Sequence, residues 1–364
     1  TGQVVGWYTS PHSSDSCQIS EHIFDDVLRQ NGVDVDSFPR KIYFFPRIFS
    51  GNCGSAGGWA STGGNPSTAY IHGSFFVDLV SHELGHNLTL GHANSIECGN
   101  KAIDNYSNCT INYYGDRYGA MGNNWYGLFH HAAFFKSWLG WILLSSIQEV
   151  TQDGLYTIYP LESATNSIQE IRIRKPDTLE YYSIEYRQPV GFDNNLPIKI
   201  TEGALIRIGY LTDYENSLKT YKSPEVYLID NNPIIHLDYT DTALSDGQTF
   251  YDEVNNISIT QISHDNNSVT LSIELDENAC NPDYPSVTVN PTSQIGLPGQ
   301  TLNYTVSVTN NDDSNCSITR FMLSKDTNYY SQGWIYSFSD EFLNINPGET
   351  KTTIYSVTSP IDSN

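Results

Sequence analysis

The segment 81–94, SHELGHNLTLGHAN, constrains the fold most, because few backbone conformations can bring its three histidines together. His82 and His86 are four residues apart, so on a helix their side chains project from one face, one turn apart. Apolar residues recur along one side of the same stretch, which predicts an amphipathic helix over about 75–88. His92 follows beyond the expected helix end, where the chain can turn back. The spacing therefore predicts a helix, a turn and three imidazoles that meet.

Three neutral imidazoles are a ligand set typical of a catalytic zinc site. Zinc binds imidazole nitrogen at about 2.0–2.1 Å, and three histidines leave a fourth position open for water. Glu83 lies about 100° around the helix from His82, so it faces that water more easily than the metal. Its expected role is general base toward the water and then proton donor to a leaving amine. The alternative is that His82 and His86 are ordinary polar residues on a helix surface. It does not account for a third histidine at the expected offset.

We therefore expect one catalytic Zn²⁺, held by His82, His86 and His92. A structural Ca²⁺ has no support, because the Asp- and Asn-rich loops lack the spacing of an EF-hand. No segment has the spacing of a nucleophile elbow, so nucleophilic catalysis by a serine is not expected.

Two segments resemble a known group of enzymes. Residues 82–92 resemble the extended metzincin motif HExxHxxGxxH, and residues 114–122, YGDRYGAMG, resemble the Met-turn of that clan. More narrowly, HELGHNL, the YGD…MG segment and LGW at 139–141 resemble the gametolysin family of extracellular metallopeptidases. The similarity covers about residues 41–142 and continues more loosely beyond them.

The resemblance implies the same three histidine ligands, with Glu83 catalytic, and it adds two further roles. Met121 would form an apolar floor beneath the metal. An edge strand would pair with extended substrate by β-augmentation, although an ordinary edge strand is an equal alternative. The residues of that strand would be Trp59, Ala60 and Ser61.

One residue departs from the clan motif. Thr89 stands where the motif has glycine, in the turn between the helix and the third ligand. A left-handed conformation there would cost a β-branched residue about 1–2 kcal/mol. We expect Gly91 to absorb the strain; the alternative is a displaced His92.

Three more side chains are candidates for the reaction. Tyr126 follows Met121 by five residues and could stabilise an oxyanion, or could be near the site by chance. His130 and His131 open an expected helix over 128–139, and either could donate to a transition state, although a structural role is favoured. Asp116 is expected to anchor the Met-turn rather than to contact substrate.

The charge excludes some partners. The formal net charge is −23, from 41 acidic and 18 basic residues, so the chain repels phosphate backbones and anionic lipid. No apolar run reaches the ~18–20 residues that span a bilayer. We therefore expect neither a nucleic-acid partner nor a membrane span.

The six cysteines form three local groups without any CxxC pair, which favours disulfides over structural zinc. Six cysteines allow 15 pairings in principle. We expect pairing by neighbourhood: Cys17 with Cys53, Cys98 with Cys109, and Cys280 with Cys316. Thr1 does not begin a signal peptide, so a mature or trimmed secreted product is expected.

After Trp141 the sequence pattern changes from alternating strand and helix signals to short strand signals separated by turn residues. We expect an α/β metzincin-type catalytic domain over 1–145, with a twisted mixed sheet and helices. Two all-β sandwich domains would follow, one over 146–278 and an Ig-like one over 279–364.

The expected function is that of a secreted zinc-dependent endopeptidase acting on extended protein substrates. One alternative is a peptidase directed at glycoproteins of cell-wall or mucin type. A second is a non-catalytic binding or adhesion module on the same scaffold, against which the intact set of three histidines and Glu83 argues. The oligomeric state is not predicted.

Overall fold

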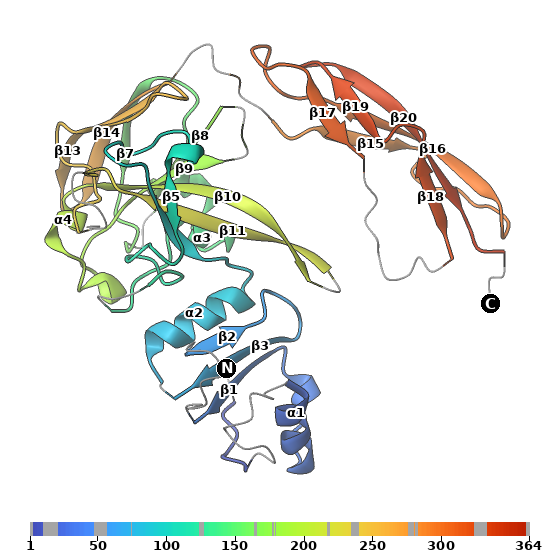
Figure 1. Ribbon diagram of the computed structural model, residues 1–364, viewed down its shortest axis with the longest axis horizontal. Coiled ribbons are helices and arrows are strands. Elements are labelled where there is room, and N and C mark those ends of the chain that lie inside the picture. Colours follow the sequence, from blue (N-terminus) through green and yellow to red (C-terminus); the bar gives the residue numbers. More distant parts are fainter. Residues whose placement is uncertain are drawn as a thin grey trace. The chain divides into compact units, whose positions relative to one another are not determined.

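The structure, a computed structural model, divides into two compact units (Figure 1). The first comprises Thr1–Ile173 with Glu180–Leu275, and the second Arg174–Leu179 with Asp276–Asn364. The residues described are 3–9, 21–46, 57–73, 75–123, 127–163, 166–176, 178, 180–216, 219–233, 240–275, 280, 283–323 and 333–361. In this part of the chain no helix is long and apolar enough to cross a membrane.

The first unit begins with a small three-stranded sheet in the order β1-β3-β2. β1 (Arg40–Phe45) runs parallel to β3 (Ser67–His72), and β2 (Gly58–Ala60) is antiparallel to β3 at the end of the order. Aromatic side chains from α1 (Glu21–Gln30) and the strands stack in a row. The ring centroids are 5.0 Å apart for Phe24–Tyr43, 5.5 Å for Tyr43–Tyr70 and 5.0 Å for Trp59–Tyr70. Helix α2 (Val77–Asn87) follows β3.

A seven-stranded sheet forms the centre of the first unit, in the order β5-β4-β11-β10-β9-β8-β6. Its β4–β11 and β6–β8 pairs are parallel, whereas β4–β5, β9–β10 and β10–β11 are antiparallel. The bounds are β4 Ala93–Glu97, β5 Thr110–Asn112, β6 Ile147–Glu149, β8 Glu170–Arg174, β9 Tyr181–Tyr186, β10 Ala204–Asn216 and β11 Lys219–Ile229.

One face of this sheet packs against a second sheet, and the two form a β-sandwich. The second layer is a four-stranded sheet of order β12-β13-β14-β7, with β7 Gly154–Ile158, β12 Thr249–Asp252, β13 Ile257–Asp265 and β14 Ser268–Glu274. Alternate residues of β10 such as Ile206 and Ile208 join one apolar core with Ile259 and Leu271 of the second layer. This period of two is what a strand buried on a sandwich face requires. The expectation of β-sandwich packing is confirmed.

The opposite face of the seven-stranded sheet supports α3 (Ala133–Trp138) and the loop 116–122. Val226 of β11 shares an apolar cluster with Met121 and Phe134. α3 packs closely, because a Cβ added to Gly209 of β10 would lie 2.7 Å from the Phe134 ring. Other short elements of the unit are α4 Ile198–Thr201 and 3-10 turns at Val35–Ser37, Tyr106–Asn108, Leu144–Ser146 and Gly191–Asp193.

The predicted fold class, a metzincin-type α/β domain followed by two sandwiches, is wrong. Strands dominate the described residues, which contain only four short α-helices. β4, expected to belong to a separate N-terminal α/β domain, pairs in parallel with β11 through Ala93 and Val226. The physical reason is long-range strand pairing, which joins segments from both sides of residue 145 in one sheet and leaves no trace in local periodicity.

The second unit has its own small core of Val306, Val308, Leu343 and Ile345. A four-stranded sheet of order β15-β16-β20-β18 accompanies a two-stranded β17–β19 sheet. The bounds are β15 Ser286–Asn290, β16 Thr301–Thr309, β17 Thr319–Met322, β18 Ile335–Phe338, β19 Phe342–Ile345 and β20 Thr350–Thr358.

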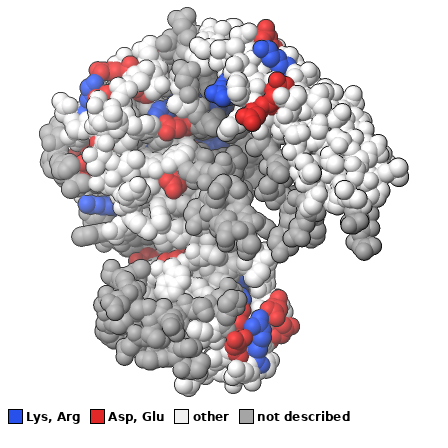
Figure 2. Space-filling view, turned by 45° about the vertical axis from the view of Figure 1, so that its right-hand side comes forward, with Lys and Arg blue, Asp and Glu red and all other residues white. Residues whose placement is uncertain are grey.

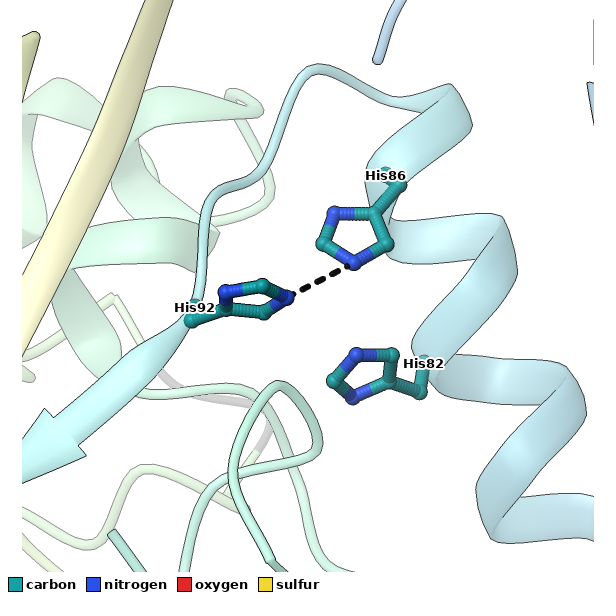
Figure 3. A group of neighbouring side chains, drawn as sticks. All are labelled: His82, His86 and His92. Atoms are coloured by element: carbon teal, nitrogen blue, oxygen red, sulfur yellow. Dashed lines mark hydrogen bonds between the residues drawn. The ribbon is translucent and has the colours of Figure 1, made fainter. Parts of the chain in front are cut away.

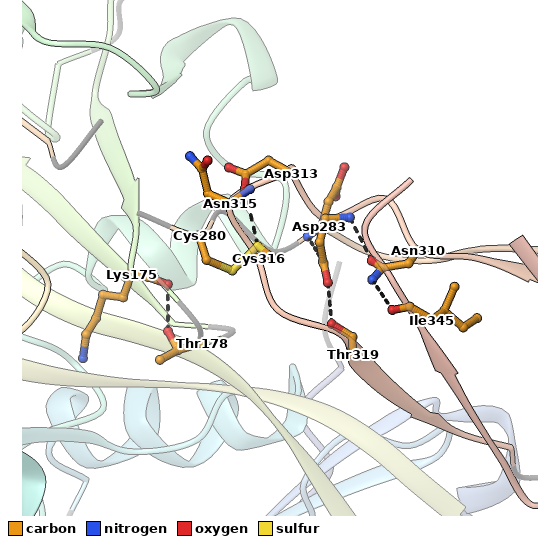
Figure 4. The surroundings of a disulfide bond; sticks show 11 residues. Lys175, Thr178, Cys280, Asp283, Asn310, Asp313, Asn315, Cys316, Thr319 and Ile345 are labelled. Atoms are coloured by element: carbon orange, nitrogen blue, oxygen red, sulfur yellow. Dashed lines mark hydrogen bonds between the residues drawn. A yellow bond between two sulfur atoms is a disulfide. The ribbon is translucent and has the colours of Figure 1, made fainter. Parts of the chain in front are cut away.

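Two disulfides confirm part of the cysteine prediction. Cys98 pairs with Cys109 in the first unit, and Cys280 with Cys316 in the second (Figure 4). Beside the second disulfide, the Thr319 hydroxyl donates to Asp312 Oδ2 at 2.7 Å. The pairing expected for Cys17 and Cys53 lies outside the described residues.

The excess of acidic residues is not gathered in one patch on the face drawn in Figure 2. Acidic and basic side chains lie there in small mixed groups, and most of the described surface carries neither. Among the described residues, Arg29 forms salt bridges with Asp26 and Asp36. On this face the charge therefore indicates no single docking site.

Candidate metal centre

Helix α2 carries His82, Glu83 and His86, and its C-terminal end is fixed to the small sheet. Asn87 donates from Nδ2 to the carbonyls of Ser61 and Thr68, both at 3.0 Å. The backbone N–H of Gly63 donates to the carbonyl of His86 at 2.8 Å. Asn87-Leu88-Thr89 also has the sequence of an N-glycosylation site. Because the Asn87 side chain is buried and its amide nitrogen is hydrogen-bonded, this nitrogen is not accessible to a glycan in the folded chain.

The turn after α2 is closed by Thr89 in a left-handed conformation, with φ of +75°. The expectation that Gly91 would absorb the strain is wrong, since Gly91 is not among the positive-φ residues. Two hydrogen bonds hold the strained residue: Trp138 Nε1 donates to Thr89 Oγ1 at 3.1 Å, and Ser223 Oγ to the Thr89 carbonyl at 2.9 Å. Position 91 has no room for a larger side chain, because a Cβ there would lie 2.7 Å from Glu225 Cγ.

The third histidine is placed by β11. The N–H of Gly91 donates to the carbonyl of Pro224 at 2.9 Å, and the N–H of Val226 to the carbonyl of His92 at 3.5 Å. β4 then continues in register beside β11. His92 is therefore not displaced, and its position depends on a strand from the distant half of the first unit.

The three imidazoles meet, with one ligand nitrogen from each within 4.8 Å of the others (Figure 3). His86 Nε2 and His92 Nε2 are 3.2 Å apart. Two nitrogen ligands at about 2.0–2.1 Å from a tetrahedral metal lie about 3.3 Å apart, so this separation fits a shared ion. His82, His86 and His92 are the group of potential metal ligands found among the described residues.

Hydrogen bonds at Nδ1 orient two of the rings. His82 Nδ1 lies 3.2 Å from the carbonyl of Ala120, and His86 Nδ1 lies 2.8 Å from the carbonyl of Leu90. A carbonyl at Nδ1 requires the proton there and leaves the Nε2 lone pair for a metal.

The histidines are held in the neutral form that binds metal. Burial, followed by the neighbouring His86 and His92, lowers the pKa of His82 to about 3. Burial, followed by the neighbouring His86, lowers the pKa of His92 to about 4, and burial also lowers the pKa of His86. Neutral imidazole is the state from which a metal ion need displace no proton.

Glu83 is buried beside the ligands, with 4% of its surface exposed. Its Oε2 has no hydrogen-bond partner among the described residues, and burial raises the pKa of this carboxyl to about 7. A buried carboxylate oxygen without a partner is costly unless another group binds there. Three imidazoles and this unsatisfied oxygen fit a metal ion that carries a water molecule.

The loop 116–122, called the floor loop below, packs against α2. Met121 is fully buried, and a Cβ added to Gly85 of α2 would lie 2.2 Å from Met121 Sδ. The N–H of Ala93 donates to the carbonyl of Met121 at 2.9 Å. Asp116 anchors the loop, since its Oδ2 accepts from Arg207 Nε of β10 at 2.7 Å.

A buried ion network extends from this anchor. Arg207 Nη1 lies 2.6 Å from Glu185 Oε1, and Arg187 Nη1 lies 2.9 Å from the same oxygen. Arg187 also pairs with Asp193 and with Glu162. The network thus ties the floor loop to β9 and β10.

The other predicted site residues are placed differently. Trp59 and Ala60 lie in β2, and Ser61 follows it with its N–H donating to the Thr68 carbonyl at 2.9 Å. β2 touches the site, because a Cβ on Gly58 would lie 3.0 Å from Glu83 Oε1. Tyr126 lies outside the described residues.

The two histidines near α3 each lie beside an aromatic side chain, and His131 also lies close to α2, because a Cβ added to Gly85 would lie 3.4 Å from His131 Cε1. His131 is buried and its ring lies 5.8 Å from that of Trp141. His130 contacts the ring of Phe192 at 5.4 Å. Neither belongs to the group of potential metal ligands found among the described residues.

Tyr114 is a site residue that the sequence did not indicate. Its ring centroid lies 4.0 Å from that of His92 and 5.8 Å from that of His82. In the sequence it is one of 25 tyrosines and marks only the start of the loop motif. Its contact with the ligands follows from a backbone conformation that no spacing rule predicts.

No protein-family model, curated protein or solved structure matches the chain. The resemblance to the metzincin and gametolysin motifs therefore remains one of short sequence segments, and the function has to be inferred from the geometry of the site.

Proposed function

We propose that this protein is a secreted zinc-dependent endopeptidase that hydrolyses peptide bonds in extended protein substrates. The observation that supports it most is the joint placement of three imidazoles, with ligand nitrogens within 4.8 Å of one another, and a buried carboxylate whose Oε2 lacks a partner among the described residues. Zinc fits this set because it favours imidazole nitrogen, and three ligands leave a coordination position for the reaction.

In the proposed hydrolysis, the three histidines and Glu83 have different roles. Zinc, when bound, supplies Lewis-acid activation of water and of the scissile carbonyl. His82 and His86 keep their ring orientation through the carbonyls at Nδ1. Glu83 accepts the proton of the attacking water at Oε2 and delivers it to the nitrogen of the leaving amine. Its burial suits this exchange, since a carboxyl with a raised pKa holds the proton long enough to pass it on.

The substrate is proposed to add to β2. This strand ends the order β1-β3-β2, so one side of it is not paired within that sheet. Gly58 lies against Glu83, and an extended peptide alongside β2 would therefore pass the carboxylate. Main-chain pairing of this kind accepts many side chains, which suits an endopeptidase. Trp59, with 38% of its surface exposed, is the side chain of β2 most able to contact the peptide.

Secretion is proposed from the disulfides. Cys98–Cys109 and Cys280–Cys316 are of the kind that persist in oxidising compartments outside the cytosol. A protein substrate in the same compartment is the corresponding partner, and the excess negative charge disfavours nucleic acid.

The test compares the full chain with Glu83→Gln and with the control Glu149→Gln, which alters an exposed strand residue. Cleavage of an unfolded fluorescent protein and bound metal would be measured in each. We expect Glu83→Gln to retain about one zinc and to lose cleavage by about 100-fold or more, because general acid–base catalysis is removed. The control should retain both properties.

Bound zinc without cleavage by the wild-type chain would overturn the peptidase proposal and favour a binding module. Absence of zinc binding in the folded chain would overturn the metal centre itself.

A further inference from the structure

The third ligand lacks the support that orients the other two. His82 and His86 each place Nδ1 against a backbone carbonyl, at 3.2 Å and 2.8 Å. None of the described residues forms a hydrogen bond with His92 Nδ1, and Figure 3 shows this atom pointing away from the other histidines. A ring that rotates about its side-chain bonds would hold a metal less well than a fixed one.

An aromatic ring packs against the face of the His92 imidazole instead. The Tyr114 ring lies over His92 with centroids 4.0 Å apart and an interplanar angle of 41°. The same ring is nearly parallel to that of His82, at 5.8 Å and 26°. Tyr114 thus restricts the imidazole of His92 by contact with its face.

The backbone is strained to present this ring. Tyr114 has φ of +59°, a left-handed conformation that is an outlier for a bulky side chain. Such strain persists only where surrounding groups enforce it, and it concentrates at functional sites.

Three neighbours enforce the conformation. The N–H of Tyr114 donates to Oδ1 of the buried Asn94 at 3.0 Å, and its carbonyl accepts from the N–H of Asn123 at 2.8 Å. The next residue, Gly115, fits closely, because a Cβ there would lie 2.1 Å from Ser95 Oγ. Asn94 and Ser95 belong to β4, the strand that begins just after His92.

We propose that Tyr114 is a positioning residue for the metal centre: its ring holds the His92 imidazole in the orientation that binds the ion. The inference rests on the proposed function, since it concerns the same metal. The ring carries the role and the hydroxyl does not. β4 therefore fixes both His92 and, through Asn94, the tyrosine that orients it.

The test measures Zn²⁺ affinity of the full chain by competition with a chromophoric chelator, together with the visible absorption of bound Co²⁺. Tyr114→Phe keeps the ring. Tyr114→Gly removes the ring and relieves the backbone, since glycine adopts positive φ freely. Tyr113→Ala, at an exposed neighbour, is the matched control.

We expect Tyr114→Phe and Tyr113→Ala to bind Zn²⁺ as the wild type does. Tyr114→Gly should bind it about 10- to 100-fold more weakly, as for loss of an outer-shell partner, with an altered Co²⁺ spectrum. The thermal midpoint of metal-free Tyr114→Gly should not fall, which separates the effect from unfolding.

Wild-type Zn²⁺ affinity and an unchanged Co²⁺ spectrum in Tyr114→Gly would overturn the positioning role while leaving the proposed function intact. Zn²⁺ binding as weak in Tyr114→Phe as in Tyr114→Gly would also overturn it, because the ring, which Tyr114→Phe keeps, would then not carry the role. A wild-type chain that binds no metal would instead overturn the proposed function.

Discussion

At the scale of single residues, the candidate metal centre depends on backbone conformations that its side chains do not favour. Thr89 and Tyr114 both have positive φ, at +75° and +59°. Thr89 follows His86 by three residues, whereas the Tyr114 ring lies against that of His92. Each is held by hydrogen bonds from other segments. The strain is thus balanced by contacts that exist only in the folded chain.

Thr89 gives a prediction about the sign of a stability difference. Alanine normally stabilises a chain relative to glycine by about 0.5–1 kcal/mol, because it restricts the unfolded state. At position 89 the left-handed conformation costs alanine about 1–2 kcal/mol and glycine nothing. We therefore expect Thr89→Gly to have a larger free energy of unfolding than Thr89→Ala. Urea denaturation of the two metal-free variants measures the difference.

A matched pair provides the control. Asp26→Ala and Asp26→Gly, at an exposed position of α1, should show the ordinary order with alanine more stable. The contrary result would be a free energy of unfolding that is larger for Thr89→Ala than for Thr89→Gly by as much as alanine exceeds glycine at position 26. In that case residue 89 does not adopt the left-handed conformation.

At the scale of elements, the floor loop is held by charges buried beneath it. Although burial alone would raise the pKa of Glu185, the guanidinium groups of Arg207 and Arg187 lower it below its usual value. The backbone N–H of Ala133, just at the start of α3, donates to the same carboxylate at 2.6 Å. The charged groups around this carboxylate are Asp116, Glu162, Lys136, Arg187, Asp193 and Arg207.

This network predicts a loss of stability in acid. A carboxyl whose pKa is lower in the folded than in the unfolded chain stabilises the fold at any pH above its unfolded-state pKa. This contribution is lost as the pH falls through the folded-state pKa. Glu185→Gln leaves buried arginine charge uncompensated, so we expect a loss of about 3–5 kcal/mol near pH 7. The difference from wild type should begin to narrow as pH falls below the unfolded-state pKa of about 4.3, and it should vanish only below the lowered folded-state pKa.

The measurement is urea denaturation of both chains between pH 7 and pH 3, with Glu149→Gln as an exposed control. A Glu185→Gln chain that is as stable as wild type at pH 7 would show that the ion pairs contribute no net stability.

Among the elements, the sequence predicts what is local. The four-residue spacing of His82 and His86 predicts a helix face, and α2 provides it. The anchoring of the loop by Asp116 is likewise observed, although its partner Arg207 lies far along the chain and could not be named. The conformation of Tyr114 could not be predicted, because it depends on Asn94 and Ser95 after β4 has formed.

At the scale of the whole first unit, one sheet serves two purposes. Its alternating side chains fill the sandwich core on one face and support Met121 and α3 on the other. Sequence periodicity distinguishes strands from helices but does not say which strands pair. The pairing of β4 with β11 was therefore missed, and with it the dependence of His92 on the later half of the unit.

This arrangement means that the sandwich supports the three histidines of the candidate metal centre. β11 accepts the hydrogen bond of Gly91, and β10 supplies the arginine that holds the floor loop. The second unit, with its separate core and disulfide, contributes none of the described ligands.

The most direct measurement removes metal from the full chain with a chelator and titrates Zn²⁺ back while bound zinc and proteolysis are recorded together. We expect no cleavage of an unfolded protein substrate by the metal-free chain, then cleavage that rises with bound zinc and saturates at about one ion per chain. Cleavage that persists without metal, or a folded chain that binds no zinc, would contradict the assignment of His82, His86 and His92 as ligands of a catalytic centre.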